Sequence, residues 1–120
     1  MRAPGQVALL RFPQSDLSAG KPRPVLLIVR VPGGRYEDWL VCMLTTQLHQ
    51  ALPGFDEILD ESQPDFVESG VRVRSLIRIW RLAVVSADML LGNLGTIGDE
   101  RLMRIRKTLA DWIEAAPKNE

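Results

Sequence analysis

The stretch from Gly20 to Thr46 places the tightest limits on how this chain of 120 residues can fold. Two nearly continuous apolar runs, Val25–Val31 and Trp39–Leu44, flank a Pro-Gly-Gly sequence at residues 32–34. Continuous apolar runs of this length are typical of central strands covered on both faces, and Pro-Gly sequences are typical of turns. We therefore expect an antiparallel pair of buried strands.

An arginine and a threonine stand at the same end of this predicted hairpin. Arg23 comes just before the first apolar run, and Thr45 directly follows the second. Because the two strands run antiparallel, the start of one and the end of the other lie at the same end of the sheet, and both side chains are expected to face one pocket. A guanidinium beside a hydroxyl suits a phosphate. The alternative is that Arg23 is a turn residue and Thr45 satisfies backbone groups at a strand end.

Outside the hairpin, the sequence predicts further strands separated by polar loops. Pro13–Pro22 is expected to be a polar loop, and the acidic stretch Asp60–Gly70 a solvated loop. Asp56 and Glu57 are expected to point outward from a short strand. The strand regions are expected at Gln6–Phe12, Phe55–Leu59 and Val71–Val85.

The C-terminal part is predicted to be helical. Ser86 is expected to cap a helical turn, and Leu91–Ile97 is expected to be a short connector. Asp99–Glu114 is predicted to be a helix whose apolar stripe closes the core. The stripe consists of Leu102, Ile105, Leu109 and either Trp112 or Ile113.

Length and composition fit one globular domain over residues 1–120, with 46% hydrophobic and 25% charged residues. No apolar run approaches the roughly 20 residues of a membrane span, and no signal peptide is evident, so a cytoplasmic location is expected. Cys42 is the only cysteine, which excludes an intrachain disulfide. It lies in a predicted strand and is expected to belong to the core.

The net charge is zero, which alone argues against nucleic acid as a partner. The distribution is less even, because residues 56–70 contain six acids and no base, whereas residues 71–86 contain four arginines and no acid. A basic face forms if the acidic stretch folds away from the arginines. A mixed, solvated surface is the alternative.

Two aromatic side chains raise competing interpretations. In an extended strand, Arg78 and Trp80 share a face with Leu76, and this pair could bind a phosphate and stack a base. For Trp80 we favour a core or dimer-contact role. His49, the only histidine, could act as a single base because imidazole titrates near neutral pH, but a partly exposed loop residue is the simpler interpretation.

Several sequence pieces, in order, make the chain resemble one known family. They are Gly5–Leu10, Lys21–Ile28, Val41–Thr46, Gly70-Val71, Ser75–Arg78 and Leu94–Glu100. Their order and spacing resemble the MazF/PemK (Kid/CcdB-like) family of ribonuclease toxins of type II toxin–antitoxin systems. The resemblance extends from Gly5 to about Ile113.

The resemblance implies a mainly β fold with a C-terminal α-helix, an SH3-like small barrel of CcdB/PemK type, usually a homodimer. It implies an mRNA interferase-type endoribonuclease that cleaves single-stranded RNA without a metal or cofactor, and an antitoxin whose disordered tail occupies the RNA groove. It also implies that Arg23 and Thr45 form the catalytic pair, with 2′-hydroxyl attack leaving a 2′,3′-cyclic phosphate. The predicted RNA contacts are Lys21, Thr46, Arg78, Arg81 and His49.

The chain departs from the family pattern at the places that would move protons. Gln6 and Trp80 stand where many members have an acidic residue, and Ala83 stands where many have an arginine. A carboxylate base at position 80 is therefore excluded. A deprotonated Arg23, His49 and substrate-assisted transfer all stay open at this point.

Two other functions compete with RNA cleavage. A non-enzymatic toxin on the same barrel, like the gyrase poison CcdB, would act through its C-terminal end, where Trp112 and Ile113 lie. A catalytically silent binding module is the third hypothesis, since Trp80 replaces an acidic residue.

Overall fold

The computed structural model describes residues 2–11 and 21–118, so Phe12 and most of the predicted loop Pro13–Pro22 lie outside the described residues. Six strands form one sheet in the order β4-β5-β3-β2-β1-β6, and all neighbours are antiparallel. The strands are β1 (Gln6–Leu10), β2 (Arg23–Arg30), β3 (Asp38–Thr45), β4 (Glu57–Leu59), β5 (Ser75–Ser86) and β6 (Leu90–Thr96). The helices are α1 (Phe66–Ser69) and α2 (Asp99–Ala115), with 3-10 turns η1 (Leu48–Gln50) and η2 (Ala87–Met89).

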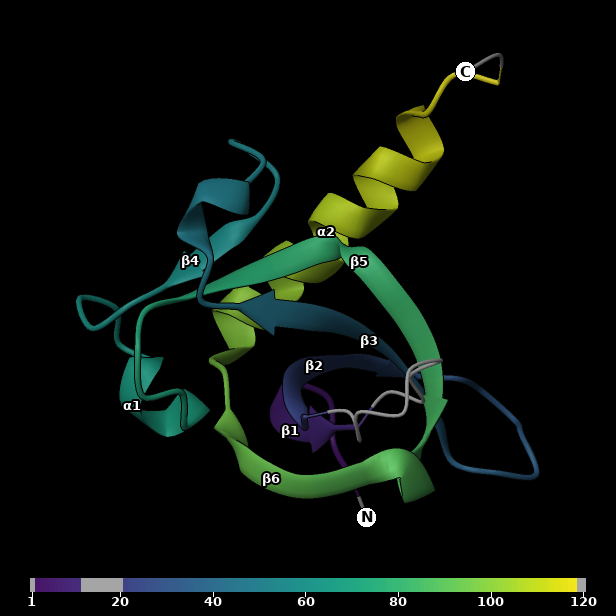
Figure 1. The fold of residues 1–120 in the computed structure, drawn as a ribbon. Helices are drawn as coiled ribbons and strands as arrows, with labels where there is room; N and C mark the ends of the chain where they lie inside the picture. The colour runs from purple at the N-terminus through teal and green to yellow at the C-terminus, as the bar shows by residue number, and fades with distance from the viewer. Residues whose placement is uncertain (1, 12–20, 119–120) are drawn as a thin grey trace.

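The sheet is strongly curved. Figure 1 shows β5 bending through a corner and leading into β6, so that these two strands arch around β1 and β2. The turn between them is η2, and the Ser86 hydroxyl accepts a hydrogen bond from the Asp88 N–H, as predicted for its cap. The structure confirms a small β-barrel architecture with a C-terminal helix.

The central strand β2 is buried on both faces, as its sequence predicts. The side chains of Val25–Ile28 are at most 1% exposed. Successive side chains point to opposite faces of a strand, so they divide between two hydrophobic clusters. The helix-side cluster contains Val7, Leu26, Ile28, Cys42, Leu44, Leu59, Ile77, Ile79, Ile97, Leu102, Ile105 and Leu109. The inner cluster contains Ala8, Leu10, Val25, Leu27, Trp39, Val41, Val85 and Leu90.

Helix α2 covers the helix-side cluster with most of the predicted stripe, because Leu102, Ile105 and Leu109 are buried. Trp112 and Ile113 are instead 43% and 66% exposed. The reason is that the last turns of α2 extend beyond the sheet (Figure 1). No helix in residues 2–11 and 21–118 is both long enough and apolar enough to cross a membrane.

A bulge in β2 is satisfied by α2. The register between β2 and β3 shifts between Leu27 and Val29, which leaves Ile28 outside the ladder. Arg106 of α2 donates hydrogen bonds from Nε and Nη2 to the Ile28 carbonyl, at 3.0 and 2.7 Å. The helix therefore replaces the strand partner that the bulge removes.

A buried arginine ties α2 to the acidic segment. The Nε of Arg101 donates to Asp65 at 2.8 Å, Nη1 to Glu57 at 2.8 Å and Nη2 to Gln63 at 2.6 Å. The Gly98 N–H also donates to Asp65, at 3.0 Å. Burial opposes the charged form of the Asp65 carboxyl, but the hydrogen bonds from Arg101 and Gly98 outweigh it and lower the pKa of Asp65.

These contacts correct two expectations. Asp60–Gly70 is not a solvated loop, because it contains α1 and supplies the buried Asp65. Glu57 does not point into solvent, because two arginines of α2 bind its carboxylate. The sequence carries no local sign of either contact, since Asp65 and Arg101 are 36 residues apart.

The predicted connector Leu91–Ile97 is largely a strand, β6, which pairs with β1. Its glycines disfavour a strand by propensity, but one of them permits close packing. A Cβ added at Gly95 would collide with the Glu68 carbonyl of α1, and one added at Gly70, whose φ is +78°, would collide with the Leu94 carbonyl. The two glycines thus let α1 pack directly on β6.

Candidate functional site

Strands β2 and β3 bring Arg23 and Thr45 together. Arg23 is the first residue of β2, and Thr45 is the last of β3. Val25 pairs with Met43, and the same register extended by two residues places Arg23 opposite Thr45. Opposed residues point to one face of a sheet, here the face of the inner cluster, which lies away from α2. Arg23 and Thr45 line one pocket of about 590 Å³.

A bulge of three residues in β5 brings two more arginines to this pocket. Cys42 pairs with Leu82, whereas Met43 pairs with Arg78, so residues 79–81 have no partner on β3. Extra residues of this kind bend a strand, and β5 turns its corner here (Figure 1). The pocket is lined by Arg23, Met43, Leu44, Thr45, Arg78, Arg81, Leu82 and Ala83.

Asp56 holds the bulge in place. Its Oδ1 accepts a hydrogen bond from the Ile79 N–H and its Oδ2 accepts one from the Leu52 N–H, each at 3.0 Å. The expectation that Asp56 points outward is therefore wrong, because its carboxylate replaces a lost ladder partner. No glycine or proline marks residues 79–81, so the sequence offered no signal for the bulge, or for Leu82 and Ala83 as pocket walls.

The pocket carries positive charge. Three arginines line it, and no carboxylate of residues 2–11 and 21–118 does. Within the described ranges, none of these three is among the cations that form ion pairs, which are Arg74, Arg101, Arg104 and Lys107. Glu57 and Asp65 of the acidic stretch are bound by arginines of α2, and this protein of zero net charge has a basic pocket that suits an anion.

Thr45 is half-buried at the pocket. Its Oγ1 accepts a hydrogen bond from the Gln47 N–H at 3.1 Å. A hydroxyl that accepts one bond still has its own O–H to donate. Thr45 therefore does satisfy a backbone N–H group at the end of its strand, as the alternative interpretation holds. Its own O–H group remains available to a ligand.

Arg78 and Trp80 form a stacked pair. The Arg78 Cζ lies 4.6 Å from the centroid of the Trp80 ring, so the predicted shared face is confirmed. Trp80 is half-buried and belongs to neither the helix-side cluster nor the inner cluster. The core role expected for Trp80 is therefore wrong, and the alternative role at a dimer contact stays a prediction.

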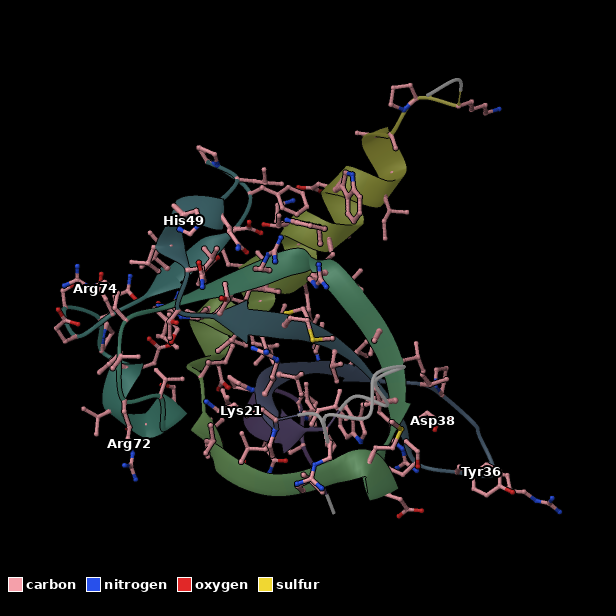
Figure 2. All side chains as sticks on the ribbon, viewed as in Figure 1. Lys21, Tyr36, Asp38, His49, Arg72 and Arg74 are labelled. Carbon is pink, nitrogen blue, oxygen red and sulfur yellow. The ribbon has the colours of Figure 1, made fainter. Side chains whose placement is uncertain are left out.

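Three other predicted RNA contacts lie outside the pocket lining. Lys21 and Thr46 are exposed neighbours of Arg23 and Thr45 in the chain. His49 is exposed on η1. Figure 2 shows Lys21 and His49 on separate parts of the molecule. The structure therefore does not bring His49 to the arginines of the pocket.

Cys42 belongs to the helix-side cluster, as expected. Burial raises the pKa of its thiol, and the nearby Asp56 carboxylate raises that pKa further. The thiol therefore stays protonated and does not act as a nucleophile.

Potential metal ligands are dispersed in the part of the chain that the structure describes. No three His, Cys, Asp or Glu side chains there are grouped so that they could hold a metal ion. The chemistry that the pocket itself offers is hydrogen-bond donation and positive charge.

Comparisons with known proteins agree with this geometry. The profile of the PemK-like, MazF-like toxins of type II toxin–antitoxin systems matches residues 3–113. Among solved structures, an endoribonuclease in complex with its cognate antitoxin, from mycobacterial species, aligns with a TM-score of 0.64 and 18% identity, covering 98% of this chain and 99% of that one. No curated protein sequence matches.

The curved antiparallel sheet with a C-terminal helix is the fold of that solved endoribonuclease. The profile match covers nearly the whole chain. The protein belongs to the family of PemK-like, MazF-like toxins of type II toxin–antitoxin systems.

Proposed function

We propose that this protein is an endoribonuclease toxin that cleaves single-stranded RNA, in particular mRNA, in the cytoplasm. The observation that carries the proposal is the pocket in which Arg23 and Thr45 are joined by Arg78 and Arg81, with no carboxylate of the described residues in its lining. Membership of a toxin family supports the biological role. The similar solved structure is itself an endoribonuclease.

In the proposed reaction, the ribose 2′-oxygen forms a bond to the adjacent phosphorus while the bond from phosphorus to the 5′-oxygen breaks. The products are a 2′,3′-cyclic phosphate and a free 5′-hydroxyl. Arg23 donates paired hydrogen bonds to the non-bridging oxygens, and the Thr45 hydroxyl donates another. These donors stabilise the charge that develops on the phosphorane.

The proton must pass from the 2′-hydroxyl to the departing 5′-oxygen. Neither a carboxylate nor an imidazole of the described residues lines the pocket, and a guanidinium is a poor base. We therefore assign the transfer to a non-bridging oxygen of the substrate's own phosphate. Lys21, Thr46 and His49 are proposed to contact the RNA where it leaves the pocket.

This assignment predicts the effect of His49→Ala. The variant is expected to keep the wild-type kcat and to raise KM, because an exposed residue outside the pocket contributes to binding alone. Cleavage kinetics over a range of pH values provide the measurement. A large fall in kcat, with loss of one limb of the pH profile, would instead make His49 the base.

The proposed function is tested with a long RNA that lacks stable structure. We expect cuts at defined positions, unchanged by a chelator, and 2′,3′-cyclic phosphate on the upstream fragment. Uncut RNA, or fragments that end in a 3′-hydroxyl, would contradict the proposal.

A second candidate function has one observation in its favour. Trp112 and Ile113 are exposed on the projecting end of α2 (Figure 1), as a contact to another protein would require. A non-enzymatic, CcdB-like toxin would leave RNA intact and inhibit gyrase supercoiling in the same preparation. A silent binding module would leave RNA intact and would not inhibit supercoiling.

We further propose a homodimer and a cognate antitoxin whose disordered tail lies in the basic pocket. The similar solved endoribonuclease is in complex with its antitoxin. An acidic tail suits three arginines that have no carboxylate partner among the described residues. If the tail occupies the pocket, a tail peptide inhibits cleavage in competition with RNA.

A further inference from the structure

We propose that Trp80 is a positioning residue, whose ring holds the Arg78 guanidinium so that Arg78 binds the phosphate next to the one that is cleaved. This inference rests on the proposed RNA cleavage and assigns a second phosphate position in the same pocket. It also gives a role to a tryptophan that lies outside both hydrophobic clusters.

The Trp80 ring lies against the Arg78 guanidinium. The 4.6 Å separation of Arg78 Cζ from the ring centroid is within the range of a cation–π contact. A carboxylate would neutralise the charge of the guanidinium. An aromatic ring restrains the guanidinium and leaves its charge in place. The guanidinium has five N–H donors, and an aromatic ring does not pair with them as a carboxylate does.

Two buried donors at this contact have no acceptor. The Nε of Arg78 and the Nε1 of Trp80 are both buried without a hydrogen-bond partner in residues 2–11 and 21–118. Leaving a buried donor unpaired is costly, and such groups in native proteins call for an explanation. An acceptor-rich ligand such as a phosphate provides one, because Arg78 also lines the pocket.

The sheet register sets this second position apart from the first. Arg78 pairs with Met43, and Leu76 pairs with Thr45, so Arg78 is the diagonal neighbour of Thr45. Diagonal neighbours lie about 7–8 Å apart, which is comparable to the separation of consecutive phosphates in an extended single strand. One phosphate bound by Arg23 and Thr45 therefore leaves Arg78 beside the next.

The test uses a short RNA that contains the preferred cut site. Each phosphate that flanks the cleaved one is replaced in turn by a neutral methylphosphonate, and kcat/KM is measured. For the wild type, one replacement is expected to lower kcat/KM about tenfold, as for a hydrogen bond to a charged group. With Arg78→Ala or Trp80→Leu, the same replacement is expected to cause no further loss, because the interaction is already missing.

Two variants separate positioning from a structural role. Trp80→Phe retains a ring and is expected to restore the sensitivity to the methylphosphonate. Arg78→Lys leaves Trp80 untouched and is expected to lose most of that sensitivity, because an ammonium lacks the planar fork. Arg78→Lys also preserves the test if Trp80→Leu fails to fold. Arg72→Ala, an exposed arginine on another part of the molecule (Figure 2), is the matched control.

The outcomes distinguish this inference from the proposed function. If the wild type cuts none of the RNAs, the proposed function fails. If the wild type cuts them, but the methylphosphonate lowers kcat/KM of Arg78→Ala by the same factor as it lowers kcat/KM of the wild type, Arg78 does not bind that phosphate. If Trp80→Leu keeps full sensitivity, Trp80 does not position Arg78.

Discussion

At the scale of single residues, the Thr45 hydroxyl has two separate hydrogen-bonding roles. Its oxygen accepts the Gln47 N–H at 3.1 Å, which orients the group. Its O–H then remains to be donated into a pocket that three arginines share. The proposed contribution to catalysis comes from the donor alone.

Thr45→Val therefore removes the donor while keeping the shape of the side chain. We expect kcat to fall by about 10²-fold, the typical loss when one preorganised donor to a developing oxyanion is deleted. Thr45→Ser retains the hydroxyl and is expected to keep most of the activity. Thr46→Val, at an exposed position that is proposed to contact the RNA only outside the pocket lining, is the comparison and is expected to keep the wild-type kcat. Equal kcat for Thr45→Val and the wild type would exclude a catalytic donor.

Arg23 and Thr45 could be placed together from sequence because only a short turn separates their strands. The alternation of side chains along a strand placed Arg78 beside Trp80, and the resemblance to the family favoured an RNA contact for Arg78. Asp65 and Arg101 could not be paired in advance, because their contact depends on how α2 packs against a distant segment. Contacts within one strand or one hairpin could thus be predicted from the sequence. Contacts between segments far apart in the chain could not.

At the scale of elements, β6 and the β5 bulge show why strand patterns alone were insufficient. The glycines of β6 argue for a connector, yet the strand forms because β1 offers a free edge and α1 packs closely at Gly95. The bulge at residues 79–81 forms because Asp56 satisfies the Ile79 N–H. Both depend on contacts between segments far apart in the chain.

The packing of α1 on β6 predicts a contrast between two glycines of the same strand. Gly95→Ala forces a Cβ against the Glu68 carbonyl, whereas a Cβ at Gly92 meets no atom of the described residues within 4 Å. Gly95→Ala is expected to lower the free energy of unfolding by about 3 kcal/mol, at the upper end of overpacking effects. Gly92→Ala is expected to change it little. Urea unfolding measures both, and equal effects would contradict the packing.

The attachment of α2 to the acidic segment predicts a pH dependence. The pKa of Asp65 is lower in the folded protein than its ordinary value of about 3.9. Its stabilisation is therefore complete above that value and is lost as the pH falls through the folded pKa. Asp65→Asn is expected to be less stable than the wild type at neutral pH and to lose less stability on acidification.

Urea unfolding between about pH 6 and pH 2 covers the range in which this loss occurs. The exposed Asp88, which has no ion pair within the described ranges, provides the control. Asp88→Asn should follow the wild-type profile. Parallel profiles for Asp65→Asn and the wild type would show that the Asp65 contacts do not favour its charged form.

At the scale of the whole molecule, the fold separates charges that sum to zero in the sequence. Glu57 and Asp65 are bound by arginines of α2 on the helix side of the sheet. The pocket on the opposite face is lined by three arginines and by no carboxylate from the part of the chain that the structure describes. Net charge therefore misrepresents the surface that a substrate would meet, and the proposed site follows from this separation.

Single-turnover cleavage of an unstructured RNA by Arg23→Ala, with Arg72→Ala as the matched control, tests the proposed role of the pocket directly. We expect Arg72→Ala to cleave like the wild type, and Arg23→Ala to fold normally but to cleave at least about 10²-fold more slowly. A folded Arg23→Ala protein that cleaves RNA at the wild-type rate would contradict that role.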